Sequence, residues 1–215
     1  MIKNLVFDFG GVFSKIELQR CIDAFEALGF KSVGEYMNLY YQKGFFGDME
    51  SGKITDEDFR REVSEHAGRE VSWEECQKTW LSFIVEVAQS NLEYVQKFKA
   101  EGYNVALLSN TNPYVTSWFR SDKFDGKGHG IDYYIPREHQ YLSYEQKCMK
   151  PGKEIFEKML AGEGFVPEET MFIDDGEVNI ETAGKLRMKT FMPANGEHWG
   201  RRLEKYLECL SEGKR

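Results

Sequence analysis

The sequence has few cysteines, no excess of positive charge and no long apolar run. Its four cysteines, Cys21, Cys76, Cys148 and Cys209, lie far apart and have no histidine at ligand spacing. Neither a disulfide framework nor a structural zinc site is therefore expected. We expect reduced thiols and a cytoplasmic location, which the absence of an apolar h-region before Asp8 also favours. No apolar stretch reaches the length needed to cross a bilayer.

Acidic residues outnumber basic ones. The chain has 36 Asp and Glu against 28 Lys and Arg, a formal net charge of −8. This balance argues against partners such as nucleic acid or an anionic membrane surface. It is compatible with a small phosphorylated metabolite, because a bound metal ion and one lysine can reverse the charge locally. The 215 residues, of which 41% are apolar, suffice for one core with a small accessory domain. The oligomeric state stays open.

Short apolar runs alternate with helical patterns over much of the chain. Buried strands are predicted at 5–7, 104–108 and 171–173, and further short strands at 131–135 and 189–192. Alternation of strands with helices predicts an α/β fold, a Rossmann-like parallel sheet with helices on both faces.

Helical patterns alone fill residues 15–88. An amphipathic helix is predicted at 18–28, and Gly29 ends it. A second helical stretch, 33–41, precedes a break predicted at 44–48. We interpret these residues as a helical cap inserted into a core that comprises residues 1–14 and 89–215.

Two helix starts support this interpretation of the cap. An acidic turn follows Thr55, and the capping box at Ser72 is predicted to open a helix that continues through Val87. The tyrosines Tyr36, Tyr40 and Tyr41 form either part of the cap core or a wall that faces a substrate.

Three predicted strands end in polar residues. Asp8 follows the first, Ser109 and Asn110 end the second, and Asp174 and Asp175 follow the third. The carboxyl ends of parallel strands share one sheet edge, so these side chains should meet in a single cleft. Three carboxylates together imply a hard divalent cation, and Mg²⁺ is the expected cofactor.

A phosphate site is the functional interpretation of this edge. Lys150 precedes a predicted helix and would add a compact positive charge beside the hydroxyl of Ser109. Each feature has a simpler alternative, since Ser109–Asn110 and the aspartate pair resemble helix caps and Lys150 could be a surface lysine. Their coincidence at predicted strand ends favours the functional interpretation.

With these motifs the sequence resembles the haloacid dehalogenase (HAD) superfamily, which is dominated by phosphatases. Residues 6–12 resemble its first motif, 107–111 the second, 150–151 the third and 172–175 the fourth. The insertion at 15–88 resembles the helical cap of the C1 class.

The resemblance implies a role for each matching residue. Asp8 would be the nucleophile, Ser109 would bind phosphate, and Lys150 would neutralise charge. The implied catalytic residues are Asp8, Ser109 and Lys150; substrate would be bound by Ser109, Asn110 and Lys150; the metal ligands would be Asp8, the Gly10 carbonyl, Asp174 and Asp175.

The sequence departs from the family pattern at Gly10. Most family phosphatases have an aspartate there as general acid and base; the α-D-glucose-1-phosphatase-like subgroup, which this chain resembles most, shares the substitution. The expected function is a Mg²⁺-dependent phosphatase that hydrolyses a small phosphorylated metabolite, for example a sugar phosphate, through an aspartyl-phosphate. The alternative is a catalytically silent ligand- or protein-binding module. Without that acid, anomeric and aryl phosphates should be better substrates than alkyl phosphates.

Overall fold

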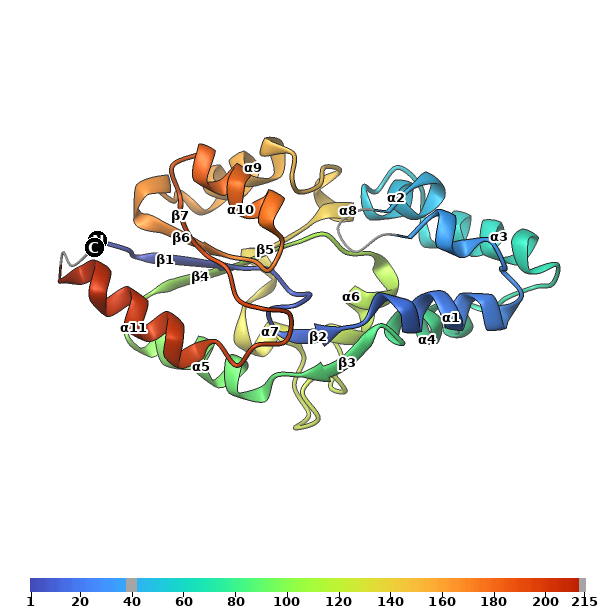
Figure 1. Ribbon diagram of the computed structural model, residues 1–215, viewed down its shortest axis with the longest axis horizontal. Coiled ribbons are helices and arrows are strands. Elements are labelled where there is room, and N and C mark those ends of the chain that lie inside the picture. Colours follow the sequence, from blue (N-terminus) through green and yellow to red (C-terminus); the bar gives the residue numbers. More distant parts are fainter. Residues whose placement is uncertain (38–41, 213–215) are drawn as a thin grey trace.

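Five parallel strands form the central sheet of the computed structural model, which describes residues 1–37 and 42–212 (Figure 1). In spatial order they are β5 (Gln140–Leu142), β4 (Asn104–Ser109), β1 (Asn4–Phe7), β6 (Thr170–Ile173) and β7 (Lys189–Phe191). Phe7 pairs with Leu107 on one side and with Ile173 on the other. β1 and β6 therefore end level with one another, and β4 continues to Ser109 at the same edge of the sheet, where an α/β fold has its functional residues.

Helices cover both faces of the sheet, and the predicted Rossmann-like fold is confirmed (Figure 1). The Val6 side chain packs on the face covered by α9 (Lys153–Glu163) and α10 (Glu177–Lys185). The neighbouring Leu5 and Phe7 point to the opposite face, covered by α5 (Gln89–Ala100) and α11 (Gly200–Ser211). Burial on both faces explains why the strands are continuously apolar.

The strand predicted at 131–135 is wrong. These residues form the helix α7 (Ile131–Tyr134), in which the N–H of Ile135 donates to the carbonyl of Ile131. A spacing of four places both isoleucines on one helical face, which a run of five residues cannot distinguish from a strand. The fifth strand is instead β5, which is too short to produce a periodic signal. The other core elements are α6 (Pro113–Phe119), η2 (Arg137–His139), α8 (Ser143–Gln146) and η3 (Pro167–Glu169).

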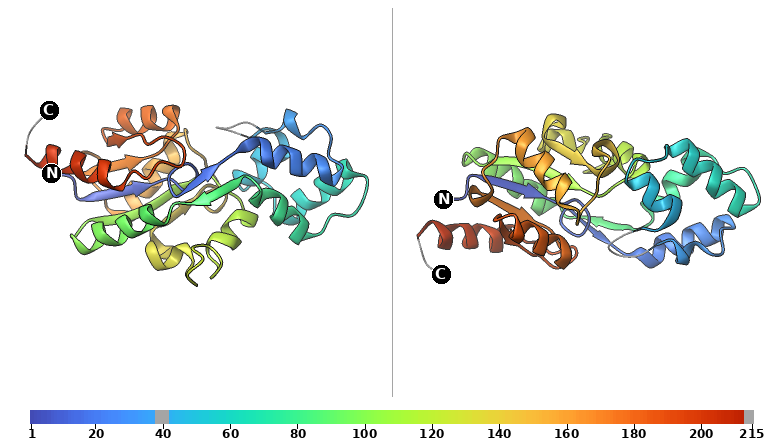
Figure 2. Two further views of the ribbon diagram at one scale, coloured as in Figure 1. Left: turned by 60° about the horizontal axis from the view of Figure 1, so that its bottom comes forward. Right: turned by 90° about the horizontal axis from the view of Figure 1, so that it is seen from above.

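Helices form one end of the molecule (Figure 2). Along the chain they lie between the two strands of an antiparallel ribbon. The ribbon consists of β2 (Ser14–Ile16) and β3 (Ile84–Val87). The helical elements between its strands are α1 (Leu18–Leu28), η1 (Val33–Glu35), α2 (Gly44–Glu50), α3 (Asp56–Ala67) and α4 (Trp73–Leu81). The cap boundary at residues 15–88 stays a prediction. No helix within the described residues is both long and apolar enough to cross a membrane.

Two predictions for this region are wrong, and one is only partly tested. Helix α4 ends at Leu81, because the β-branched residues of 84–87 pair with β2 instead of extending the helix. The break predicted at 44–48 is the start of α2, where Gly44 adopts a positive φ of 53°. Of the stretch 33–41, only η1 is helical among the described residues, and Tyr40 and Tyr41 lie outside them.

Helix caps follow the sequence signals closely. Gly29 ends α1 in the left-handed conformation, and Ser72 makes the expected capping box with Glu75. Asn112 caps α6 ahead of Pro113. The ring of Tyr36 packs against the rings of Phe30 and Phe45, which favours a core role for this tyrosine.

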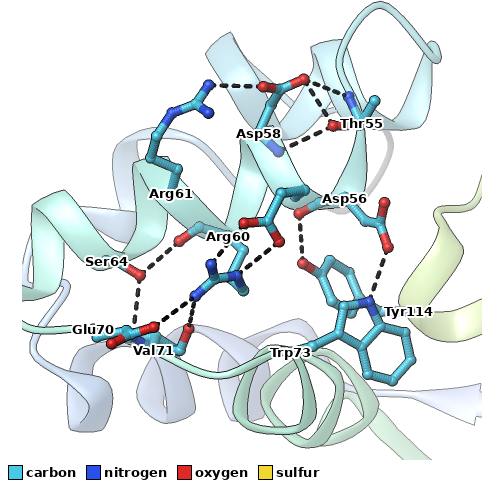
Figure 3. A network of polar contacts seen from close by, with 11 residues as sticks. Thr55, Asp56, Asp58, Arg60, Arg61, Ser64, Glu70, Val71, Trp73 and Tyr114 are labelled. Carbon is cyan, nitrogen blue, oxygen red and sulfur yellow. Dashed lines mark hydrogen bonds and ion pairs between the residues drawn. The ribbon is translucent and has the colours of Figure 1, made fainter.

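One tyrosine of the core enters the cap (Figure 3). Tyr114 of α6 is fully buried, and its hydroxyl donates to the carbonyl of Asp56 at 2.7 Å. The indole N–H of Trp73 donates to the carboxylate of the same Asp56 at 2.9 Å, and its ring lies 5.1 Å from that of Tyr114. The start of α3 is therefore attached to the core by polar and aromatic contacts.

Replacing Tyr114 by phenylalanine should remove the hydroxyl contact while keeping the aromatic packing. We expect the free energy of unfolding to fall by about 1 kcal/mol, or roughly 2–4 °C in thermal midpoint. Differential scanning calorimetry of the variant measures this. The control is Tyr133→Phe, because the Tyr133 side chain is exposed. Equal midpoints for both variants would contradict a stabilising role of the contact.

Candidate active site

The ends of β1 and β6 bring three aspartates together. The N–H of Asp8 donates to the carbonyl of Ile173 at 2.9 Å, so Asp8 lies beside the start of the Asp174–Asp175 pair. Carboxylate oxygens of Asp8, Asp174 and Asp175 all lie within 4.8 Å of one another. The predicted convergence of these residues is confirmed by this geometry.

A fully buried lysine lies between two of the aspartates. Lys150 Nζ is 2.8 Å from Asp8 Oδ1 and 2.6 Å from Asp174 Oδ2. Burial alone would lower the lysine pKa, but the two carboxylates raise it above its ordinary value. The lysine is therefore held as a cation. The simpler alternative of a surface lysine does not apply, because a surface lysine would lack these contacts.

Asn110 fixes the position of Lys150. Its Oδ1 accepts from the N–H of Lys150 at 2.9 Å, and its Nδ2 donates to the Lys150 carbonyl at 2.8 Å. The polar end of β4 therefore orients the lysine through the backbone. The predicted role of Asn110 in substrate binding stays a prediction.

Asp174 is saturated with hydrogen-bond donors. Its Oδ1 accepts from the N–H of Gly176 at 2.7 Å, and both of its oxygens accept from the Asn179 amide at 3.1 Å. Together with Lys150 these donors occupy about four acceptor positions, the capacity of a carboxylate. Direct metal ligation by Asp174 would require one of these bonds to break, which favours an orienting role.

Asp8 and Asp175 carry negative charge that is only partly compensated. Asp8 Oδ1 is buried, and its polar partner among the described residues is Lys150 Nζ. Burial raises the pKa of Asp8, and burial followed by repulsion from Asp8 and Asp174 raises the pKa of Asp175 to about 7. Two carboxylates whose negative charge is only partly offset are a suitable donor set for a hard divalent ion.

Gly11 makes room for this arrangement. A Cβ atom at this position would lie 2.1 Å from Asp175 Oδ2, and Gly11 has a positive φ of 73°. Only glycine satisfies both constraints without displacing Asp175. The second glycine of the first motif is therefore needed for the position of Asp175 as well as for the turn.

The aspartates line a cavity of about 270 Å³ that extends under the cap. Its polar wall includes Asn110, Thr111, Asn112, Asn179 and Asn195, and its apolar wall Ile16, Leu18, Met37, Trp80, Phe83 and Val115. Gln42 and Glu50 of the helical region also line it. The mixture of one charged end and an amphipathic remainder suits a small polar metabolite.

Most of the predicted site residues line this cavity, but Ser109 is not among the described residues that do. Asp8, Gly10, Asn110, Lys150, Asp174 and Asp175 all line it. Ser109 is buried at the strand end, and its hydroxyl contacts the Asn110 carbonyl at 3.4 Å. Sequence analysis missed Asn179 and Glu50. The polar residue five positions after Asp174, in the first turn of a helix, was a signal for Asn179, whereas no local signal marks Glu50.

Comparison with known proteins gives consistent matches. The family profile described as haloacid dehalogenase-like hydrolase matches residues 2–186. The chain is 39% identical over 203 residues, 94% of this chain and 97% of the other, to a D-ribitol-5-phosphate phosphatase of Bacteroides thetaiotaomicron.

Two solved structures are similar throughout. A predicted HAD-like family hydrolase from Porphyromonas gingivalis superposes with a TM-score of 0.90 at 36% identity, over 96% of this chain and 98% of that one. A HAD family enzyme of B. thetaiotaomicron, in complex with magnesium and inorganic phosphate, superposes with a TM-score of 0.82 at 36% identity, over 94% of this chain and 99% of that one.

Asp175→Asn tests the charge balance of the site. At pH 8, above the raised pKa, wild-type Asp175 is ionised and disfavours the metal-free fold. The amide should stabilise that fold by roughly 1–3 kcal/mol. Added Mg²⁺ should raise the thermal midpoint of the wild type but much less that of the variant. Calorimetry with EDTA and with Mg²⁺ measures both effects, and Asp122→Asn, at an exposed position, is the control. An unchanged Mg²⁺ shift in Asp175→Asn would exclude this residue as a ligand.

Proposed function

Because the chain belongs to the haloacid dehalogenase-like hydrolase family, we propose that Asp8 is its catalytic nucleophile. The protein is a Mg²⁺-dependent phosphatase that acts on a small phosphorylated metabolite. The observation that supports the role of Asp8 most directly is its ion pair with the buried Lys150, which favours the ionised form of this carboxyl group at the end of the cavity. A carboxylate in this state can attack phosphorus.

The proposed reaction has two steps. Asp8 attacks the phosphorus atom, the ester bond breaks, and the alcohol leaves with a proton from solvent or the site. Water then attacks the aspartyl-phosphate, which releases inorganic phosphate and regenerates Asp8. Lys150 offsets charge on the phosphoryl oxygens while Asn110 and Asp174 hold it in place. Ser109 is proposed to donate its hydroxyl to the phosphate.

The metal site is proposed to comprise Asp8, Asp175 and the Gly10 carbonyl, with Asp174 orienting Lys150. When bound, Mg²⁺ supplies positive charge to the phosphoryl group and aligns it with the nucleophile. Asp174 has its acceptor positions filled by Lys150, Gly176 and Asn179, which supports an indirect role.

A catalytically silent binding module is the less favoured function. A protein-binding module would have no need to bury one lysine between two carboxylates with a third nearby, because that arrangement is costly unless a ligand compensates it. The similarity to a phosphatase favours the enzyme over a module that only binds a ligand.

We propose a phosphorylated polyol or sugar as the substrate, with the phosphate on a primary hydroxyl. The support is the similarity to a phosphatase named for D-ribitol 5-phosphate, an ester of that kind. The lack of an acid at Gly10 favours easier leaving groups, such as the anomeric oxygen of a sugar 1-phosphate. The resemblance to α-D-glucose-1-phosphatases also stays a prediction. A panel of phosphate esters decides between sugar 1-phosphates and esters of primary hydroxyls.

All four cysteines are free, which supports a proposed cytoplasmic location.

Replacing the proposed nucleophile by its amide should abolish turnover. Asp8→Asn is nearly isosteric, and we expect the rate with p-nitrophenyl phosphate and Mg²⁺ to fall by at least about 10³-fold, because an amide cannot form the aspartyl-phosphate. Rapid acid quench of a single turnover with ³²P-labelled substrate should trap label on Asp8 of the wild type. Asp122→Asn should retain full activity. Substantial activity in Asp8→Asn would exclude the covalent mechanism.

The substrate proposal predicts an order of efficiencies. D-Ribitol 5-phosphate should have a higher kcat/KM than glucose 1-phosphate or glucose 6-phosphate, and EDTA should abolish all three activities. Phosphate release with excess Mg²⁺ measures the order. If glucose 1-phosphate were the best of the three, the leaving-group argument based on Gly10 would replace the polyol proposal.

A further inference from the structure

One buried carboxylate in the cavity has no role in the proposed chemistry. Glu50 is the last residue of α2 in the helical region, which contacts α8 of the core (Figure 1). Its side chain lines the same cavity as Asp8 and Lys150, and the residue is 8% exposed. It approaches that cavity from the cap side, whereas the aspartates lie at the sheet edge.

Within the described part of the chain, Glu50 makes no ion pair. Burial raises its pKa to about 7, and only the side chain of Asn112 acts in the opposite direction. The Asn112 oxygen already accepts from the N–H of Val115 at 3.1 Å, so its amide group is what it can offer to Glu50. A buried carboxylate with one neutral partner retains free acceptor positions and is unfavourable for the fold.

These observations indicate what would complete the site. Hydroxyl groups can donate to the free lone pairs without adding charge, and several hydroxyls on one carbon chain can do so together. A carboxylate or a second phosphate on the substrate would instead be repelled by Glu50. The nearby apolar wall of Trp80 and Phe83 would accommodate the carbon skeleton.

We propose that Glu50 is the residue that selects substrates with a neutral polyhydroxyl tail, by accepting hydrogen bonds from the hydroxyls distant from the phosphate. This inference rests on the proposed polyol or sugar phosphate substrate and assigns the residue that recognises it. Glu50 discriminates against anionic tails for the same reason. The phosphate end is bound by Lys150 and the metal site.

The test compares three phosphate monoesters with wild type and Glu50→Gln at pH 8 with Mg²⁺. D-Ribitol 5-phosphate has hydroxyls, pentyl phosphate is an ester of a primary alcohol without them, and p-nitrophenyl phosphate needs no leaving-group acid. The variant should lose roughly 10–100-fold in kcat/KM with D-ribitol 5-phosphate, mainly through KM, because a hydrogen bond to a charged acceptor is lost. The other two substrates should change by less than about 3-fold, the range of uniform effects.

A structural readout and a matched variant complete the test. Glu50→Gln should have a thermal midpoint equal to or above that of the wild type, since the ionised carboxylate is disfavoured in the fold at pH 8. Asp48→Asn changes an exposed carboxylate on the same helix, paired with Lys53, and should alter none of the three efficiencies. A lower midpoint with equal losses on all substrates would make Glu50 structural and overturn the proposal.

Two further outcomes are distinguishable. Equal losses on both alkyl phosphates, with p-nitrophenyl phosphate spared, would assign Glu50 to protonation of the leaving group and reject recognition of the tail. If the wild type hydrolyses p-nitrophenyl phosphate but prefers pentyl phosphate to D-ribitol 5-phosphate, the polyol proposal and this inference both fail while the phosphatase stands. Hydrolysis of none of the three would reject the phosphatase itself.

Discussion

The burial of three carboxylates around one lysine is the constraint on which the rest of the site depends. Lys150 contacts Asp8 and Asp174 directly. Its single charge does not offset that of Asp175, whose ionised form is disfavoured by burial and by repulsion from Asp8 and Asp174. Buried charges of this kind destabilise a fold unless partners compensate them. The structure compensates Asp174 internally, through Gly176 and Asn179, and leaves Asp8 and Asp175 with negative charge that a bound cation would offset. Folding therefore leaves an electrostatic repulsion between carboxylates, and binding of a cation would relieve it.

The sheet makes this arrangement geometrically simple. Because β1 pairs in register with β4 and β6, the residue after each strand arrives at the same edge without any long-range adjustment. The sharp turn at Gly11 then brings the backbone against Asp175, at a distance that no other residue would allow. Pairing of two segments separated by more than 160 residues therefore fixes the spacing of the carboxylates.

Sequence reasoning succeeded where the signal is local. Apolar strands that end in Asp8, Asn110 and Asp174 are visible as short runs, and helix caps such as Ser72 depend on neighbouring residues alone. It failed for elements defined by their partners: β3 is a strand because β2 pairs with it, and β5 is three residues long. Glu50 escaped notice for the same reason, since an ordinary surface glutamate and a buried one look identical until packing is known.

The attachment of the cap to the core gives the Glu50 assignment its physical basis. Tyr114 passes from α6 into the aromatic core of the helical region and holds Asp56, while Lys147 of the core donates to the Gly52 carbonyl just beyond α2. Asn112, at the start of α6, is also the neighbour of Glu50. Residues of one core segment thus position both Lys150, through Asn110, and the cap carboxylate Glu50, through Asn112. A substrate that spans the cavity would consequently contact Lys150 at one end and Glu50 at the other, and the same short stretch of chain sets the distance between these two residues. Selection by the length of the substrate and selection by its charge would then depend on the same residues.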